Sequence, residues 1–400
     1  MKKCTLIWIF ALFTLLTTGC TNSQLPNDNT YHQEWDYPNM FNIQGYGLEM
    51  TSAEKGYYFL HENLIYYMDK NSKQTVLLDN RPDNHCKNKP DSTNCNAFVE
   101  KTEPNPPNFI QYYNSQLYVL ENFWDKESKR SKFDTIWKLS RLDLDGKNRK
   151  EIKKFDTAPR SIAIHRGYLY YSVVSAGKDN VLRTQVLREK LEGTKKEEVL
   201  FTDKGMLDDI TDIVPYGNQL YWIAWTSKGG YLTQRYDLDS GKISSLWDRE
   251  DGSSNILLNI SEDKLYFSYF YGEPGDKRAL QIYSSDLNGG QIEEVKIEHP
   301  PVLSKFFKDK TYTYIRPIDS YSSDLPQDYP YELAIFKNNK KIHTVNLSSL
   351  TKLNETIVGD DKFMFIRYMG QGKKGILYLD KTLIESGKAD FQPLLESKTE

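Results

Sequence analysis

One pattern recurs seven times along the chain, and it constrains the fold more than any other feature of the sequence. Each copy contains a short aromatic run, and the copies align on Tyr58, Tyr118, Tyr170, Tyr221, Tyr266, Tyr312 and Met364. The interval is longest from Tyr58 to Tyr118, at 60 residues, and shortest from Tyr221 to Tyr266, at 45 residues. A repeat of this length is typical of architectures in which one supersecondary unit packs against the next.

Each copy follows one internal plan. A short apolar run such as FIQYY or ITDIV precedes a polar turn and the aromatic strand. A variable polar loop then leads to an alternating strand such as YLTQRYDL, a tight turn and a final short strand. The tight turns contain Asp145-Gly146, Glu192-Gly193, Asp239-Ser240-Gly241 and Asn288-Gly289-Gly290. Such residues supply the positive φ angles that hairpin turns need, so each unit is predicted to hold four antiparallel strands.

This plan predicts an all-β fold, a β-propeller of seven four-stranded blades that occupies residues 43–400. The 28 Tyr, 18 Phe and 7 Trp of the chain also favour strands. Six or eight blades remain possible because terminal repeats are usually atypical. Two packed sandwich domains are the structural alternative, but they would not require the same unit seven times. Residues 31–47 are a candidate edge strand for the last blade.

The units resemble the YWTD propellers of low-density-lipoprotein-receptor type and related propeller lipoproteins of bacteria. Leu220-Tyr221-Trp222 matches the start of that repeat. Its later turn is matched by Leu144-Asp145-Gly146, Leu191-Glu192-Gly193 and Leu287-Asn288-Gly289. The Thr-Asp pair is missing from every copy, and Ile223-Ala224 stands there in the best one. The resemblance implies a propeller fold and transfers no binding residue.

The first twenty residues resemble a bacterial lipoprotein signal. Lys2 and Lys3 precede an apolar stretch at residues 6–16, which ends in Leu-Thr-Thr-Gly-Cys at Cys20. The resemblance implies that residues 1–19 are removed and that Cys20 carries lipid, with acyl chains such as palmitate. The protein would then sit on the outer side of a bacterial cell membrane, with residues 20–42 as a flexible tether. An ordinary secretory signal and a short membrane anchor are the alternatives.

Two further cysteines, Cys86 and Cys95, lie close together in the sequence HCKNKPDSTNC. In an extracytoplasmic protein an isolated pair at this spacing predicts a disulfide. Two free thiols on a loop are the alternative. A metal site has less support, because only His85 lies nearby and structural zinc takes four ligands.

Charge and motifs narrow the class of function. The formal net charge is −3 with acids and bases interspersed, so nothing indicates a nucleic-acid partner. The sequence contains no nucleophile elbow, zinc-protease helix, phosphate loop or dinucleotide fingerprint, and neither a cofactor nor a metal is expected. Turns such as Asp143-Leu144-Asp145-Gly146 lack the full calcium-loop pattern, and their side chains are expected to bond their own backbone.

The loops between the second and third strands are the candidate binding face, because a propeller projects all of them to one side and rigid scaffolds position functional loops. They mix aromatic with charged residues, which suits contact with a protein or a glycan. Ordinary loop decoration is the alternative. The candidate binding residues are Trp124, Trp225, Tyr271, Arg316, Tyr321, Arg367 and Tyr368.

The sequence therefore predicts a membrane-anchored, non-catalytic propeller that binds a protein, a peptide or an envelope glycan through this face. One alternative is an extracytoplasmic enzyme that acts on a glycan or a small molecule. Its acid and base would come from Asp208, Asp209 and Asp212, which lie at or near an innermost strand. The other alternative is a scaffold subunit of an envelope complex.

Overall fold

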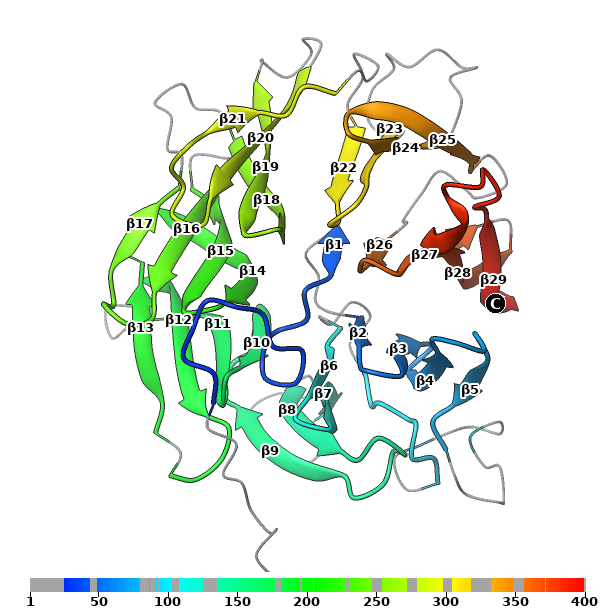
Figure 1. Ribbon diagram of the computed structural model, residues 1–400. Coiled ribbons are helices and arrows are strands. Elements are labelled where there is room, and N and C mark those ends of the chain that lie inside the picture. Colours follow the sequence, from blue (N-terminus) through cyan, green and yellow to red (C-terminus); the bar gives the residue numbers. More distant parts are fainter. Residues whose placement is uncertain are drawn as a thin grey trace, which may run out of the picture.

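The computed structural model is a ring of seven antiparallel sheets, a seven-bladed β-propeller (Figure 1). The structure describes residues 25–43, 49–79, 86, 91, 94–102, 108–124, 135–176, 181–194, 196–203, 205–227, 230–246, 254–271, 279–297, 304–317, 332–347, 356–370 and 372–398. Within these ranges no helix has the length and apolar character needed to cross a membrane.

In each blade the strands follow one another in chain order from the centre of the ring outward. Blade 1 is β2 (Met50–Ser52), β3 (Gly56–His61), β4 (Leu64–Asp69) and β5 (Thr75–Leu77); blade 2 is β6 (Ile110–Tyr113), β7 (Gln116–Trp124), β8 (Thr135–Leu142) and β9 (Lys150–Phe155). Blade 3 is β10 (Ser161–His165), β11 (Tyr168–Ala176), β12 (Leu182–Lys190) and β13 (Glu198–Thr202); blade 4 is β14 (Leu207–Tyr216), β15 (Gln219–Thr226), β16 (Tyr231–Asp237) and β17 (Ile243–Ser245). Blade 5 is β18 (Ser254–Ser261), β19 (Lys264–Tyr271), β20 (Ala279–Asp286) and β21 (Glu293–Glu294); blade 6 is β22 (Ser304–Lys308), β23 (Thr313–Pro317), β24 (Glu332–Lys337) and β25 (Lys340–Asn346). Blade 7 is β26 (Thr356–Gly359), β27 (Phe363–Gly370), β28 (Lys373–Asp380) and β29 (Phe391–Lys398), with the 3-10 turn η2 (Lys381–Leu383) before β29.

Blade 7 has a fifth strand, β1 (Phe41–Ile43), which closes the ring. It runs antiparallel to β26, with Phe41 opposite Gly359 and Ile43 opposite Ile357. The edge strand expected from residues 31–47 is therefore present, but it lies on the inner side of the blade, near the ring centre (Figure 1). The Phe41 ring stacks on that of Phe307 in blade 6 at 5.5 Å, so the strand also joins blades 6 and 7 through apolar contact.

The two faces of the ring are different. We call the side with the turns between first and second strands the turn face, and the side with the loops between second and third strands the loop face. Residues 25–37 lie on the turn face, where they contact the first turns of blades 2, 3 and 4. Asn114 donates its backbone N–H to the Glu34 carbonyl, Arg166 donates its own to the Trp35 carbonyl, and Asn218 donates its own to Asn29 Oδ1. Residues expected as a flexible tether are thus held against the propeller from residue 25 onward.

The repeated tyrosine joins neighbouring blades at two boundaries. The Tyr221 hydroxyl donates to the Leu287 carbonyl of blade 5 at 2.7 Å, and the Tyr58 hydroxyl reaches the Leu144 carbonyl of blade 2 at 3.5 Å. Leu144 and Leu287, whose carbonyls accept these bonds, are the first residues of two of the Leu-Asx-Gly turns found in the sequence. Gly289, in one such turn, has φ +81° and would place a Cβ only 2.7 Å from the Leu246 side chain of blade 4. At these two boundaries the repeated Tyr and the Leu-Asx-Gly turn meet across neighbouring blades.

The first turns also correct the alignment of the last two copies. In blade 4 the second strand starts with Gln219 opposite Tyr216, and Tyr221 is its third residue. In blade 6 the Asp309 N–H donates to the Tyr312 carbonyl, so the position of Tyr221 is taken by Tyr314 and not by Tyr312. The corresponding bond in blade 7 joins Asp360 to Phe363, and the equivalent residue is Phe365, which is fully buried. The alignment by side-chain type therefore placed the copy in blade 6 two residues too early and the copy in blade 7 one residue too early.

Cys86 and Cys95 form a disulfide, as predicted, with sulfur atoms 2.04 Å apart. Both residues are buried and belong to the apolar cluster between blades 1 and 2, together with Val99, Val119 and Leu142. The disulfide therefore anchors the long connection between these two blades to their shared core.

Candidate functional site

Two of the predicted binding residues, Trp124 and Trp225, lie partly exposed on the loop face. Trp124 ends β7 and is 38 % exposed, and Trp225 lies near the end of β15 and is 37 % exposed. The Trp225 ring contacts that of Tyr231 on the neighbouring strand edge to face, with centroids 4.7 Å apart. This contact orients the indole while leaving part of it open to solvent.

Other predicted binding residues have different places in the structure. Arg316 and Tyr368 are buried, so the packing of blades 6 and 7 removes both from the exposed rim expected for them. The Tyr368 hydroxyl donates to Glu396 Oε2 at 2.8 Å. Tyr271 is the last residue of β19, and only its backbone is described. Tyr321 lies outside the described residues.

Further exposed apolar side chains lie on the loop face of blades 3 and 4. Met206, between blades 3 and 4, is 68 % exposed, and Leu182, at the start of β12, is 67 % exposed. The Ser227 N–H donates to the Met206 carbonyl at 3.0 Å, which places Met206 beside the end of β15. We call Trp124, Val181, Leu182, Met206 and Trp225 the apolar patch. Val181, Leu182 and Met206 could not be predicted from the sequence, because single apolar residues in loops have no periodicity.

A charged cluster lies at the loop-face end of the innermost strands of blades 1, 2 and 7. Glu49 directly precedes β2, Asn108 comes shortly before β6, and Arg367 belongs to β27. Arg367 Nη1 and Asn108 Nδ2 both donate to Glu49 Oε1. Lys101 Nζ donates in turn to Asn108 Oδ1. We call these four residues the mouth cluster, because the first strands surround the centre of the ring.

The mouth cluster places two cations beside one carboxylate. Burial lowers the pKa of Lys101 to about 8, and the nearby Glu49 carboxylate opposes that effect. Glu62 and Lys374 form a neighbouring ion pair, with nitrogen and oxygen 2.7 Å apart, so their two charges cancel. The cluster as a whole therefore carries one excess positive charge at neutral pH.

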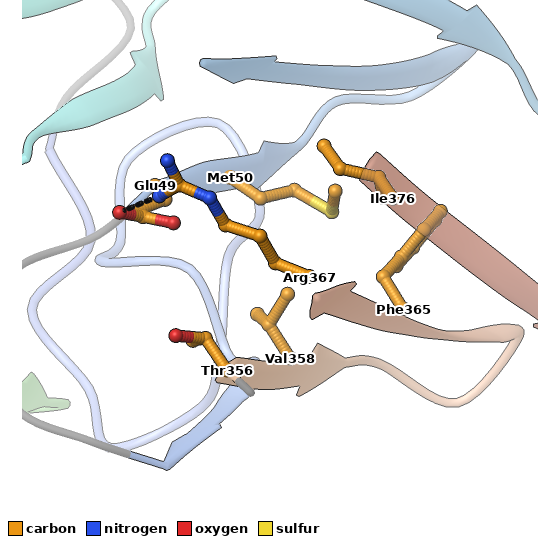
Figure 2. A pocket seen from close by; sticks show the side chains of 7 residues that line it. All are labelled: Glu49, Met50, Thr356, Val358, Phe365, Arg367 and Ile376. Atoms are coloured by element: carbon orange, nitrogen blue, oxygen red, sulfur yellow. Dashed lines mark hydrogen bonds and ion pairs between the residues drawn. The ribbon is translucent and has the colours of Figure 1, made fainter. Parts of the chain in front are cut away.

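A pocket between blades 7 and 1 opens beside this cluster. Its enclosed part is small, about 20 Å³, which is room for one or two water molecules, and the rest of the space is open to solvent. Figure 2 shows the Arg367 guanidinium turned toward Glu49, with the apolar side chains on the other side of the pocket. The lining residues are Glu49, Met50, Thr356, Val358, Phe365, Arg367 and Ile376. The pocket thus combines a mostly apolar lining with one cation, Arg367, that is paired with Glu49.

The acids considered for catalysis lie at different points of blade 4 and its surroundings. Asp208 is exposed, and Asp209 lies opposite Trp225, with Oδ2 3.7 Å from Arg160 Nε. Asp212 lies farther along β14, opposite Ile223, where burial raises the pKa of its carboxyl to about 6. The structure therefore gives these three carboxyl groups three different environments.

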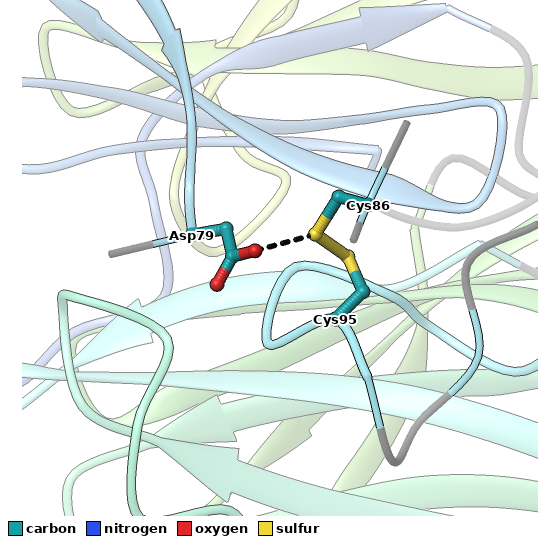
Figure 3. A group of neighbouring side chains, drawn as sticks. All are labelled: Asp79, Cys86 and Cys95. Atoms are coloured by element: carbon teal, nitrogen blue, oxygen red, sulfur yellow. Dashed lines mark hydrogen bonds between the residues drawn. A yellow bond between two sulfur atoms is a disulfide. The ribbon is translucent and has the colours of Figure 1, made fainter. Parts of the chain in front are cut away.

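Asp79, Cys86 and Cys95 bring metal-ligand atom types together within the described residues (Figure 3). Asp79 Oδ2 lies 2.8 Å from Cys86 Sγ. Metal ions bind cysteine as the thiolate, and both sulfur atoms are bonded to each other in the disulfide. These three residues are therefore not a set of metal ligands while the disulfide is formed.

No protein-family model matches the chain, and no curated protein matches it significantly. Solved structures do match. A structure from a study of two prolyl endopeptidases is 11 % identical, with a TM-score of 0.53 over 92 % of this chain and 51 % of that chain. Prolyl oligopeptidase B from Galerina marginata is 11 % identical, with a TM-score of 0.51 over 92 % of this chain and 52 % of that chain.

The tricorn protease is 10 % identical, with a TM-score of 0.50 over 93 % of this chain and 36 % of that chain. The chain thus spans about half the length of the two prolyl peptidases and less of the tricorn protease. At such low identity these likenesses show the propeller fold alone.

Proposed function

We propose that this protein is a non-catalytic binding protein that docks a protein or peptide partner on its loop face. A lipid on Cys20 would hold it on the outer side of a bacterial cell membrane. The observation that carries the proposal is the apolar patch, where large apolar side chains are exposed on the loop face around blades 2, 3 and 4. Exposed apolar patches with polar surroundings are typical of interaction sites.

The chemistry of the patch favours a protein partner over a glycan. Glycans are bound mainly by aromatic faces and by arrays of hydrogen-bonding groups, whereas Met206 and Leu182 offer neither. Trp124 and Trp225 are the large, rigid anchors that dominate protein interfaces, and Met is enriched there as well. The resemblance to YWTD propellers is compatible with such docking.

The N-terminal segment supports the orientation of this face. Leu25 lies against Gly167 in a first turn of blade 3, on the turn face. Leu25 is only five positions after Cys20, and a chain of that length spans at most ~18 Å. A lipid on Cys20 would therefore keep the turn face next to the membrane and direct the apolar patch away from it.

Partner capture tests the docking proposal. The full chain, purified from detergent-solubilised membranes, is compared with a Met206→Ser and Leu182→Ser double variant and with Trp225→Ala. The matched control is Val76→Ser with Val199→Ser, because both valines are exposed on the outermost strands of their blades. We expect partners that the wild type and the control retain but the patch variants lose. Identical partners on all variants would refute the docking surface.

Lipidation is tested separately with Cys20→Ser. We expect the wild type to incorporate a palmitate analogue and to fractionate with membranes, and the variant to do neither. Incorporation that persists in Cys20→Ser would contradict the anchor at this residue.

A further inference from the structure

The N-terminal segment, residues 25–37, covers part of the turn face but buries little of itself there. Most of its residues are exposed or half-buried, and Asp36 is the one fully buried side chain among them. Trp35 and Tyr37 pack only partly against the apolar clusters of blades 2 to 4. A segment with so little buried apolar surface can detach locally while the rest of the protein stays folded.

One contact of this segment depends on the charge of a histidine. His165 is the last residue of β10 and is fully buried. Its Nδ1 accepts the Tyr37 N–H at 3.1 Å, and its Nε2 lies 2.7 Å from the Gly217 carbonyl. The ring is therefore neutral, with its proton on Nε2, while the segment is in place. A second proton on Nδ1 would face the Tyr37 N–H, and this hydrogen bond would be lost.

The charged groups that face His165 do not remove this conflict. Among the described residues they are Asp36, with Oδ1 3.6 Å from Nδ1, and Arg166 in the same turn as the histidine. Both Asp36 oxygens already accept from Arg166, at 2.7 and 3.2 Å. Blade 4 contributes the uncharged Gly217 carbonyl. Burial lowers the pKa of His165 to about 4, although Asp36 opposes this effect.

We propose that the N-terminal segment is a pH-sensitive tether, which lies on the turn face at neutral pH and is released in mild acid. While it is bound, the free connection from Cys20 ends at Leu25, five positions later, and spans at most ~18 Å. After release the connection runs to Phe41 at the start of β1, 21 positions from Cys20, and spans up to ~75 Å. The change in reach rests on the proposed function, since it requires the lipid on Cys20.

The pH dependence has a defined sign. Release uncovers His165, so its pKa returns toward about 6.5, whereas the bound segment keeps it near 4. The released state therefore binds more protons between these values, and acid favours it. From pH 7 to pH 5 the ratio of released to bound segment should rise about twentyfold.

Hydrogen–deuterium exchange of the full chain in detergent tests the release. Protection factors, corrected for the intrinsic pH dependence of exchange, are compared at pH 7 and pH 5. We expect residues 28–37 to lose protection about twentyfold, and strand β8 in blade 2 to keep its protection. An equal loss in β8 would mean that the whole propeller opens, and it would overturn the proposal. Unchanged protection of residues 28–37 would overturn it as well.

A histidine variant tests the origin of the effect. Glutamine offers an acceptor and a donor but takes up no proton, so His165→Gln should reduce the loss of protection to less than about twofold. The matched control is His343→Gln in blade 6, because His343 Nε2 also lies 2.7 Å from a carbonyl, that of Ala389. The control should respond as the wild type does. A wild-type response in His165→Gln would refute the role of His165.

The reach is measured on the full chain bound to phosphatidylcholine vesicles. A dye on Val199→Cys, at an exposed position of an outermost strand, transfers energy to a dye on the lipid headgroups. We expect lower transfer at pH 5 than at pH 7, and a smaller change in His165→Gln. Release without any change in transfer would refute the tether. A chain that binds no vesicles at either pH would overturn the lipid anchor and the change in reach, but not the acid release.

Discussion

Arg166 and Asp36 form a buried ion pair between the first turn of blade 3 and the N-terminal segment. Arg166 Nε donates to Asp36 Oδ1 at 2.7 Å, across 130 residues of sequence. The same guanidinium donates to the carbonyls of Asp28 and Thr30. One side chain thus holds the N-terminal segment on the turn face, and β1 follows only a few residues later.

Asp36→Ala should destabilise the propeller strongly. Removing one partner of a buried ion pair leaves the other charge desolvated, which costs about 3–5 kcal/mol. Urea unfolding measures the loss, and limited proteolysis should detect earlier cleavage before residue 41. The control is Arg141→Leu, because Arg141 pairs with the well-exposed Glu192 and should change the stability by less than about 1 kcal/mol. Equal losses of stability in the two variants would contradict the stabilising role of the ion pair between Arg166 and Asp36.

His165 should make the protein sensitive to mild acid. Tyr37 N–H donates to His165 Nδ1 at 3.1 Å, and His165 Nε2 lies 2.7 Å from the Gly217 carbonyl, so the ring is neutral with the proton on Nε2. Burial lowers the pKa of His165 to about 4. The unfolded chain takes up a proton below about pH 6.5, and the folded protein does not.

Stability contributed by neutral His165 is therefore lost as pH falls from about 6.5 toward 4. The loss between pH 7 and pH 5 should be about 2 kcal/mol, and His165→Gln should remove it. Urea unfolding at both pH values measures the difference. A His165→Gln variant with the same acid sensitivity as the wild type would assign that sensitivity to other groups.

Asp212→Asn should stabilise the protein at neutral pH, because burial raises the pKa of Asp212 to about 6. The unfolded chain ionises this group from about pH 4, so the wild type loses stability as pH rises from 4 to 6. The variant should exceed the wild type in melting temperature at pH 7 and lose that advantage near pH 4. A constant difference between the two proteins at all pH values would contradict the shift.

Tyr221→Phe should weaken the boundary between blades 4 and 5. The substitution removes the hydrogen bond to the Leu287 carbonyl and should cost about 0.5–1.5 kcal/mol. Tyr266→Phe is the control at the same repeat position, since the described residues offer its hydroxyl no partner. Chemical denaturation measures both, and Tyr266→Phe should cost less.

Replacing Cys86 and Cys95 together by serine should cost about 2–3 kcal/mol, because the disulfide closes a loop with a sequence separation of nine residues. Reduction of the wild type should lower its stability by a similar amount and leave the double variant unchanged. A reductant effect of equal size on both proteins would point to some other target.

Part of the candidate site could be predicted from the sequence. Trp124, Trp225 and Arg367 were identified because loops between second and third strands must share one face. Arg316 and Tyr368 were not distinguished from them, since burial depends on neighbours that a strand pattern does not specify. Glu49, Lys101 and Asn108 escaped notice because they come from the connections of different blades, and nothing in their spacing relates them.

The sequence by itself determined the repeated blade, because alternation of apolar and polar residues and Asx-Gly turns are local signals. It also determined the disulfide, since two cysteines so close together have few other partners. The tertiary structure decided how the ring closes, through the pairing of Phe41 with Gly359. It also decided which residue of blades 6 and 7 takes the position of Tyr221, because turn geometry sets strand register and a shift of one residue reverses the side that a side chain faces.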